Sequence, residues 1–282
     1  MSATPGSVSI EGDVVFGSAG DLELKGDIYH PPAALNKRTA VIHVYGGGFE
    51  RGNRMQAGDA AHKFAERGYP SLTVWHRLTH EGKWPAPVHD VKTAIRWARA
   101  NAGRLAIDAT KIAVSGYSSG GQLALIVAGS ANLSELEGDG GNAGRGTDVA
   151  ACIAYYVGGP VSRLSNGEDH PVMPPGSSDE AYHAADAMTY VRPGFPPTAL
   201  LHSTTDHLAP FELSLGFFHA LRDAGAKAEL HLFEGLSHIF DRYPEFGSAC
   251  ADLCDLFLDR NVVDPRDYPP HTPSRPGRAR RA

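Results

Sequence analysis

The sequence has little cysteine, no excess of basic residues and no long apolar run. Its odd number of cysteines, Cys152, Cys250 and Cys254, argues against a disulfide framework and fits a reducing compartment. Lys and Arg number 26 against 32 Asp and Glu, so the net charge of −6 offers nucleic acid no long-range attraction. No apolar stretch reaches the length of a membrane span, and the first residues lack a secretory signal pattern. We therefore expect a cytoplasmic protein without membrane or nucleic-acid partners.

The sequence does not indicate metal or cofactor chemistry either. Cys250 and Cys254 stand four residues apart in a helix-like segment, but no further Cys or His lies at ligand spacing from them. We expect all three cysteines to be buried as small hydrophobic residues, and no metal or cofactor to be required.

Apolar residues make up 42% of the 282 residues, which is enough for one large core. Residues 8–29 alternate apolar and polar side chains, as antiparallel edge strands do. From residue 39 onward, β-branched runs alternate with helix-like segments, which is typical of βαβ units and a mostly parallel sheet. The runs fall at 39–45, 70–75, 111–115, 148–157, 198–202 and 227–233, and helices are expected to begin near 58, 88, 119, 211 and 244. We predict a single α/β domain over 1–260, a doubly wound sheet with helices on both faces.

Two segments depart from this alternation. Residues 158–192 are rich in Gly, Pro, Ser and Asp, with a short helix expected at 179–188. Such a segment is typical of a lid or binding insertion, and we expect Tyr182 and Met188 to help form the substrate pocket. Residues 261–282 are rich in Pro and Arg and are predicted to be a disordered tail.

The strongest chemical signal is Gly116-Tyr117-Ser118-Ser119-Gly120, which matches G-x-S-x-G directly after a predicted strand and before a predicted helix. A nucleophilic serine needs such a sharp strand-to-helix turn, because small flanking residues let the backbone fold tightly and expose the hydroxyl. We therefore predict Ser118 as the nucleophile. Ser119 is the competing candidate, but it lies outside the central position of the pattern.

Three glycines, Gly46 to Gly48, follow the buried strand 39–45. Consecutive glycines let a backbone approach a substrate closely and aim N–H groups into a site, as an oxyanion hole requires. We predict the N–H groups of Gly47, Gly48 and Ser119 as donors to the oxyanion. The alternative is a flexible turn without a role in catalysis.

A carboxylate and a histidine must follow the serine along the chain, in that order. Asp206 comes just after the predicted strand 198–202, and His238 comes after 227–233. Because the carboxyl ends of parallel strands meet at one edge of a sheet, we predict Asp206 to orient His238 and His238 to act as general base. The alternatives are His202, His207 and His231 for the base, and Asp186 or Glu234 for the acid.

These motifs resemble those of the esterase and lipase branch of the α/β-hydrolase superfamily, which includes carbohydrate and small-acyl esterases, hormone-sensitive-lipase-like esterases and arylformamidases. The resemblance covers roughly residues 14–260, with the motifs in family order. Gly46 to Gly48 are similar to HGGG, 116–121 to G-D-S-A-G-G, and 76–92 to Y-R-L-A-P-E with its F-P and D-V-K continuation. The resemblance implies an α/β-hydrolase fold with a triad of Ser118, Asp206 and His238.

Three positions depart from the family's motifs. Tyr45 stands where HGGG has its histidine, His76 stands where the family has tyrosine, and His80 stands where it has proline. The oxyanion donors are backbone N–H groups, so Tyr45 need not abolish the hole. The shape and polarity of the acyl pocket are left open by these departures.

The sequence therefore predicts a serine esterase that cleaves a small-molecule carboxylic ester of a small or medium acyl group through an acyl-enzyme on Ser118. Arylformamidase, amidase or acyltransferase chemistry on the same triad stays open, as does a non-catalytic ligand-binding protein of this fold. The modest apolar content of 158–192 argues against long-chain lipids as substrates. A homodimer stays open beside a monomer.

Overall fold

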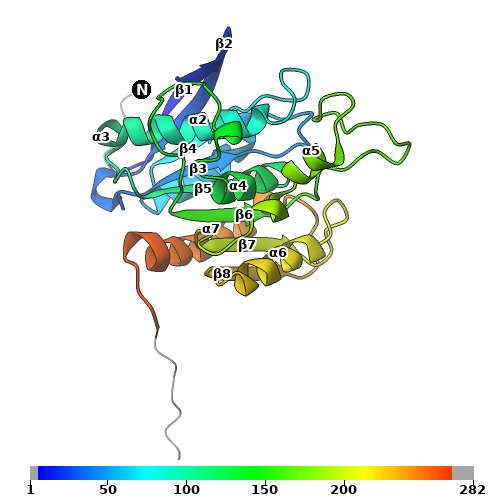
Figure 1. Ribbon diagram of the computed structural model, residues 1–282. Helices are drawn as coiled ribbons and strands as arrows, with labels where there is room; N and C mark the ends of the chain where they lie inside the picture. Colours follow the sequence, from blue (N-terminus) through cyan, green and yellow to red (C-terminus); the bar gives the residue numbers. More distant parts are fainter. Residues whose placement is uncertain (1–5, 269–282) are drawn as a thin grey trace, which may run out of the picture.

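The chain folds around one eight-stranded sheet in the computed structural model, which describes residues 6–268 (Figure 1). The strands are β1 (Ser9–Ala19), β2 (Leu22–His30), β3 (Ala40–Val44), β4 (Ser71–Val74), β5 (Ile112–Tyr117), β6 (Ala151–Tyr155), β7 (Thr198–Ser203) and β8 (Ala228–Phe233). Their order across the sheet is β1-β2-β4-β3-β5-β6-β7-β8. β2 pairs antiparallel with β1 and β4, and all the other neighbours are parallel. The predicted mostly parallel sheet with antiparallel N-terminal strands is confirmed.

Helices cover both faces of the sheet, as predicted. The α-helices are α1 (Gly58–Glu66), α2 (Ala86–Ala100), α3 (Ala102–Leu105), α4 (Ser119–Gly129), α5 (Asp179–Ala184), α6 (Glu212–Asp223) and α7 (Pro244–Leu258). Short 3-10 turns lie at η1 (Ala33–Leu35), η2 (Arg54–Ala57), η3 (Ser134–Leu136), η4 (Ala187–Tyr190) and η5 (Phe240–Arg242). α2, α4 and α6 pack on one face, while α1 and α7 pack together on the other (Figure 1). Within residues 6–268 no helix is both long and apolar enough to span a bilayer.

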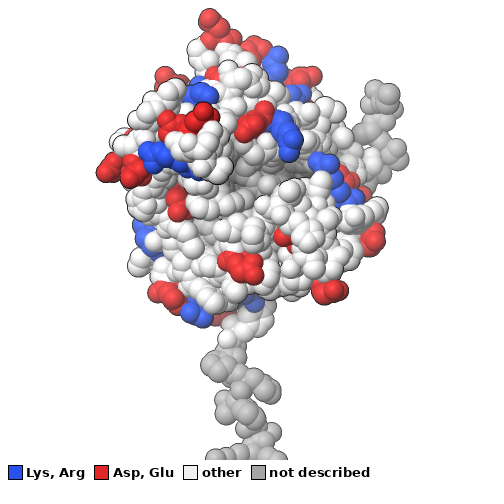
Figure 2. Space-filling model, turned by 90° about the vertical axis from the view of Figure 1, so that its right-hand side faces the viewer, with Lys and Arg blue, Asp and Glu red and all other residues white. Residues whose placement is uncertain are grey.

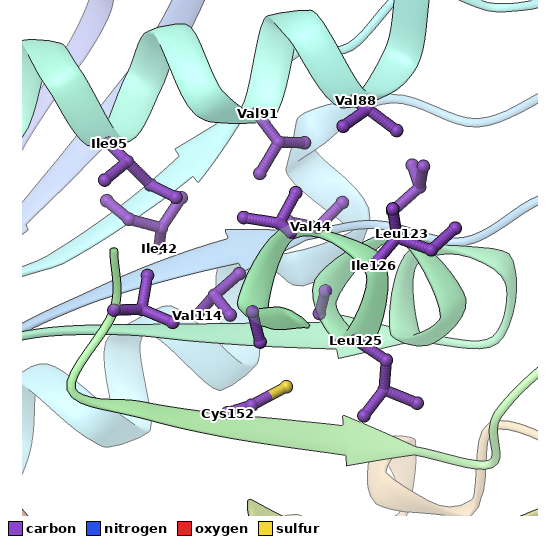
Figure 3. Close-up of a cluster of buried hydrophobic side chains, with 14 of the residues drawn as sticks. Ile42, Val44, Val88, Val91, Ile95, Val114, Leu123, Leu125, Ile126 and Cys152 are labelled. Atoms are coloured by element: carbon purple, nitrogen blue, oxygen red, sulfur yellow. The ribbon is translucent and has the colours of Figure 1, made fainter. Parts of the chain in front are cut away.

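The larger part of the core lies between the central strands and the pair α2 and α4 (Figure 3). Val88, Val91 and Ile95 recur at helical spacing on α2 and point toward Ile42 and Val44 of β3. All five side chains are fully buried. Burial of each such side chain contributes about 1.5–3 kcal/mol, so this contact sets how α2 lies on the sheet.

The opposite face of the sheet has its own apolar cluster, to which Phe64 of α1 and Phe257 of α7 contribute. Cys250 and Cys254 belong to this cluster, and Cys152 of β6 belongs to the other one. The three cysteines are free and buried, which confirms their predicted role as small hydrophobic residues. Burial raises the pKa of each thiol.

The two irregular segments differ from expectation in detail. Within 158–192 only α5 and η4 are regular, yet Val161, Val172 and Tyr190 belong to the buried core cluster to which α4 also contributes. At the other end, the domain does not stop at residue 260, because a π-helical turn, η6 (Asp259–Val263), continues from α7 and buries Val262. Regular structure therefore runs three residues past the expected boundary at 260. Residues 269–282 of the expected tail lie outside the described residues.

Candidate active site

Ser118 lies in the sharp turn between β5 and α4. Its φ of 56° and ψ of −121° are rarely adopted by a residue with a side chain, and such strain costs on the order of 1–3 kcal/mol. The flanking glycines make the turn sterically possible. A Cβ on Gly116 would lie 2.0 Å from the carbonyl oxygen of Gly120, and one on Gly120 would lie 2.2 Å from that of Val44. The predicted strand-turn-helix context of the G-x-S-x-G pattern is present.

Ser118, His238 and Asp206 form a hydrogen-bonded line. His238 Nε2 lies 3.0 Å from Ser118 Oγ, and His238 Nδ1 lies 2.6 Å from Asp206 Oδ2. Asp206 follows β7 and His238 follows β8, so the strand order brings their loops to the edge where β5 ends. With Nδ1 donating to the carboxylate, Nε2 is left to accept the serine O–H.

Asp206 is held as an anion in a site closed to water. Burial of its side chain raises its pKa, but the backbone N–H of Ala209, His238 and the backbone N–H of Leu208 outweigh that effect, and the net pKa is lowered. The two N–H groups donate to Oδ1 at 3.0 and 2.9 Å. Oδ2 faces His238 Nδ1 at 2.6 Å and also lies 3.4 Å from His202 Nε2. This division of its two oxygens fixes the orientation of the imidazole.

The rival acids and bases do not hydrogen-bond to Ser118 within the described residues. His202 is buried behind Asp206, where its Nδ1 lies 2.7 Å from Ser214 Oγ and its Nε2 lies 2.8 Å from the carbonyl of Ala209. His231 lies on β8 beside Glu229, at 3.2 Å. Asp186 accepts the N–H of Met188 at the start of η4, and His207 and Glu234 are exposed. The structure gives a hydrogen bond between Ser118 Oγ and His238 Nε2, and it gives none between Ser118 Oγ and these rivals within the described residues.

The three predicted oxyanion donors differ in their surroundings. Within residues 6–268 the N–H groups of Gly47 and Ser119 have no hydrogen-bond acceptor. The N–H of Gly48 instead donates to Ser119 Oγ at 3.0 Å. The hydroxyl of Ser119, the competing nucleophile of the sequence analysis, thus ties the glycine loop to α4. Two of the three donors are open to an oxyanion in this structure.

Gly158 is a residue of the site that the motifs do not indicate. Its N–H donates to the carbonyl of Ser118 at 3.1 Å. A Cβ at this position would lie 3.2 Å from the backbone nitrogen of Ser119. The missing side chain therefore keeps the space in front of that N–H open. This role depends on the contact between the loops after β5 and β6. The sequence alone does not indicate it, because Gly158 is one glycine in a glycine-rich stretch.

Tyr156 also contacts the triad without being indicated by a motif. Its ring meets the His238 imidazole edge to face, with ring centroids 4.7 Å apart. Its hydroxyl donates to Asp241 Oδ1 at 2.7 Å, and its backbone has a φ of 35°. Desolvation by burial raises the pKa of Asp241, even though this hydrogen bond opposes the change. Tyr156 thus connects the loop after β6 to the loop that carries His238.

Two of the departures from the family's motifs turn out to be one feature. Tyr45 and His76 stack with their ring centroids 4.2 Å apart and their planes 15° from parallel. The Tyr45 hydroxyl donates to the carbonyl of His76 at 3.0 Å, and both side chains are buried. Burial raises the pKa of Tyr45 and lowers that of His76, so both rings are neutral. The tyrosine and histidine of the family's motifs have in effect exchanged places.

Ser118 and His238 open into a cavity of about 370 Å³. The other lining residues are Tyr45, Gly46, Gly47, Gly48, Arg51, Gln56, Tyr117, Tyr156, Gly158, Leu208, Ala209, Ile239 and Arg242. From the insertion 158–192 only Gly158 takes part. Tyr182 instead donates its hydroxyl to Asp169 at 2.9 Å, so its expected place in the pocket is wrong.

Met188 lines a second cavity of about 190 Å³ on the far side of Gly158. Leu213 and Phe217 of α6 contribute to its largely apolar wall. The expectation that Met188 helps to form a pocket therefore applies to this neighbouring cavity rather than to the one at Ser118. Gly158 lines both cavities, so the two adjoin each other beside the nucleophile.

Side chains suited to a metal do not gather at the site. No group of three or more His, Cys, Asp or Glu that could hold a metal ion occurs within residues 6–268. A serine, an imidazole placed to accept its proton and a buried carboxylate are instead suited to nucleophilic attack on a carbonyl.

Comparison with known proteins adds independent information. Residues 26–221 match the BD-FAE family model. Esterase LipQ of Mycobacterium tuberculosis is 32% identical over 228 residues, covering 76% of this chain and 53% of that protein. The probable carboxylic ester hydrolase LipM of the same organism is 28% identical over 272 residues, covering 90% of this chain and 61% of that protein. The chain thus spans little more than half the length of these relatives.

Solved structures of similar fold include esterase 2 of Thermogutta terrifontis. Its apo form is 28% identical, has a TM-score of 0.77 and covers 93% of this chain and 97% of its own. A second structure of that esterase, phosphoramylated by tabun, has the same TM-score at 27% identity and covers 94% and 98%. The similarity therefore extends over essentially the whole domain of both proteins, and the α/β-hydrolase fold is shown.

Proposed function

The chain belongs to the BD-FAE family, and on that premise we propose that it is a serine hydrolase that cleaves a small-molecule carboxylic ester through an acyl-enzyme on Ser118. The observation that carries the proposal is the line of hydrogen bonds from Ser118 through His238 to Asp206, facing a cavity with two open N–H groups. The names of the relatives, which are esterases or carboxylic ester hydrolases, support the same reaction type.

In the first half of the reaction, Ser118 Oγ attacks the ester carbonyl while His238 Nε2 takes its proton. The negative charge that develops on the carbonyl oxygen is stabilised by the N–H groups of Gly47 and Ser119. The N–H of Gly48 joins them if its bond to the Ser119 hydroxyl is exchanged for one to the oxyanion. Ionised Asp206 stabilises the imidazolium and holds its tautomer. His238 then protonates the alcohol, which leaves.

In the second half, water replaces the alcohol in the cavity. His238 takes a proton from this water, which attacks the acyl carbonyl, and the same N–H groups receive the second oxyanion. His238 finally returns the proton to Ser118 Oγ, and the carboxylic acid leaves. Each group thus performs the same task in both halves of the reaction.

The test compares two serines that are adjacent in sequence. We expect Ser118→Ala to lower kcat for a short aryl ester by about 10⁴-fold or more, because the nucleophile of a triad enzyme is lost. Ser119→Ala should lower it by no more than about tenfold, because only the hydroxyl that ties down Gly48 is removed. Comparable losses in the two variants, or a Ser118→Ala variant within tenfold of the parent, would overturn the assignment.

Rates of cleavage over a panel of aryl esters, acetylated sugars and formamides show which acyl group the enzyme prefers. We propose that small or medium acyl esters are cleaved fastest, because the cavity beside Gly158 measures only about 190 Å³. Faster cleavage of formamides would favour the arylformamidase alternative. An added alcohol that diverts the product from acid to ester would favour acyl transfer. We also propose a cytoplasmic location, which suits three free, buried thiols.

A further inference from the structure

We propose that the ester cleaved at this site carries an anionic group, such as a carboxylate, which Arg51 and Arg242 bind at the mouth of the active-site cavity. The inference rests on the proposed function and deepens it, because it names the class of ester that Ser118 receives. Both arginines line the cavity that contains Ser118 and His238. Arg51 follows the glycine loop, and Arg242 follows the loop of His238.

Neither of these two arginines is held in an ion pair within residues 6–268, although Arg242 is close enough to Asp241 to oppose the burial-driven rise in the pKa of that carboxyl. Most arginines within residues 6–268 are ion-paired with a carboxylate, as Arg54 and Arg77 are. Neither Arg51 nor Arg242 has a carboxylate within ion-pair distance in the described part of the chain. Two unpaired guanidinium groups that share one cavity are therefore available to a ligand.

No carboxylate within the cavity competes for them. Its lining contains no Asp or Glu. Asp206 is shielded, since its side chain is 0% exposed and lies behind His238. Asp241, which precedes Arg242, accepts the Tyr156 hydroxyl instead. Glu50, which precedes Arg51, is exposed and lies outside the lining. The mouth of the cavity is therefore positive.

This positive mouth contrasts with the molecule as a whole, which has a net charge of −6. The face at the carboxyl ends of the parallel strands is hollowed near its centre, and Lys or Arg side chains stand around the hollow with Asp or Glu side chains beside them (Figure 2). A cleft lined by one sign of charge with apolar walls concentrates ligands of the opposite sign. A guanidinium also binds a carboxylate through two parallel hydrogen bonds, which adds geometric selectivity.

The two adjoining cavities divide the substrate into two parts. The anionic part lies toward Arg51 and Arg242, and the apolar part enters the cavity of Met188 and Phe217 beyond Gly158. The ester carbonyl lies between them at Ser118. An ester of a dicarboxylic acid or an ester of a hydroxy acid has this pattern, whereas a neutral ester leaves both guanidinium groups without a partner.

The kinetic test uses two matched pairs of esters. In one pair the acyl group is charged or neutral, as in aryl hemisuccinate against the aryl ester of monomethyl succinate. In the other pair the alcohol is charged or neutral, as in 4-carboxyphenyl acetate against 4-carbamoylphenyl acetate. We expect kcat/KM to favour the anionic member of one pair by about tenfold or more. The pair that shows the preference tells which side of the ester the arginines bind.

The double variant Arg51→Gln/Arg242→Gln should bring that ratio close to one. Arg145→Gln is the matched control, because Arg145 is exposed, has no ion pair within residues 6–268 and lies outside the cavity. It removes a positive charge from the molecule and should leave the ratio unchanged. A parent without preference in either pair, or a double variant that keeps the preference, would overturn the proposal.

A binding measurement separates this proposal from the proposed function. Calorimetry on Ser118→Ala requires no turnover, and we expect it to show tighter binding of 4-carboxyphenyl acetate or aryl hemisuccinate than of the neutral partner. The preference should disappear when Arg51→Gln and Arg242→Gln are added. If the parent cleaves none of the esters, the proposed function fails, while this binding preference still decides whether the mouth takes an anion.

Discussion

The floor and the mouth of the cavity at Ser118, the proposed active site, are built in different ways. The floor consists of Ser118 and the glycine loops, where backbone packs on backbone so tightly that a Cβ on Gly116 would lie 2.0 Å from another carbonyl oxygen. The mouth consists of exposed side chains, such as Leu208 at 78% exposure and Ile239 at 39%. Arg51 and Arg242 belong to the mouth as well.

This difference separates chemistry from selectivity. Oxyanion donors must already point at the place where charge develops, so the floor tolerates almost no change in shape. Exposed side chains at the mouth can be exchanged at little cost in stability, usually within about 0.5 kcal/mol. We therefore expect variants in the floor to abolish turnover or folding, and variants in the mouth to change which ester is preferred.

The largest effect should come from Asp206, just below the floor. We expect Asp206→Asn to lower kcat by about 10³- to 10⁴-fold, because the amide would favour the wrong tautomer of His238. Glu234→Gln is the matched control, since Glu234 is an exposed carboxylate after the neighbouring strand. The kcat of this control should stay within about threefold of the parent value. Steady-state kinetics on a short aryl ester measures kcat for both variants. Similar losses of kcat in the two would contradict the role of Asp206 in orienting His238.

The next effect concerns the packing of the floor itself. Gly120→Ala should lower the free energy of unfolding by at least about 3 kcal/mol, because its Cβ would lie 2.2 Å from the carbonyl oxygen of Val44. Gly103→Ala, at a position where a Cβ meets nothing within 4 Å, should be neutral or slightly stabilising. Urea denaturation followed by circular dichroism measures the difference, and equal stability would contradict a backbone-packed floor.

A smaller effect is expected where floor and mouth meet. Gly158→Ala would bring a Cβ 3.2 Å from the Ser119 nitrogen, and we expect kcat to fall by about tenfold to hundredfold as this donor is obstructed. At Gly159 a Cβ would only touch a Leu213 methyl group at 3.8 Å. Gly159→Ala should therefore retain the kcat of the parent. An unaffected Gly158→Ala enzyme would show that the Ser119 N–H is not used.

The last effect concerns His43, a buried histidine beneath the floor, and the pH dependence of stability. Burial lowers the pKa of His43 to about 3, so the folded chain keeps this ring neutral. Below about pH 6.5 this ring takes up a proton in the unfolded chain but not in the folded chain. The free energy of unfolding therefore falls as the pH is lowered. We expect His43 to account for about 2 kcal/mol of the loss between pH 7 and pH 5. His43→Gln should be less sensitive to pH by that amount in urea denaturation, and an unchanged pH dependence would contradict this.

Much of the floor could be predicted from the sequence. β-branched runs with turn residues between them located the strands to within a few residues, and the strand-serine-helix context selected Ser118. Asp206 and His238 were selected by their positions after strands, because parallel strands end at one edge. The structure brings these three side chains together, because each position follows from a local pattern plus one rule of sheet topology.

The contacts made by loops and irregular segments, in the mouth and elsewhere, could not be predicted in the same way. The stacking of Tyr45 on His76, the obstruction that Gly158 avoids and the pairing state of Arg51 all depend on loops that are distant in sequence. Nor could composition indicate that Val161 and Val172 pack into the core, or that Val262 extends the domain past residue 260. Side chains in irregular segments have no periodicity that would indicate what they contact.

The most direct test of the account is the location of the acyl group during turnover. The enzyme is mixed with an aryl ester, quenched in acid within the first turnovers and digested for mass spectrometry. We expect the mass of one acyl group on the peptide that contains Ser118, localised to that residue by fragmentation, and no adduct in Ser118→Ala. Turnover with the acyl group on another residue, or an adduct that persists in Ser118→Ala, would contradict the central claim.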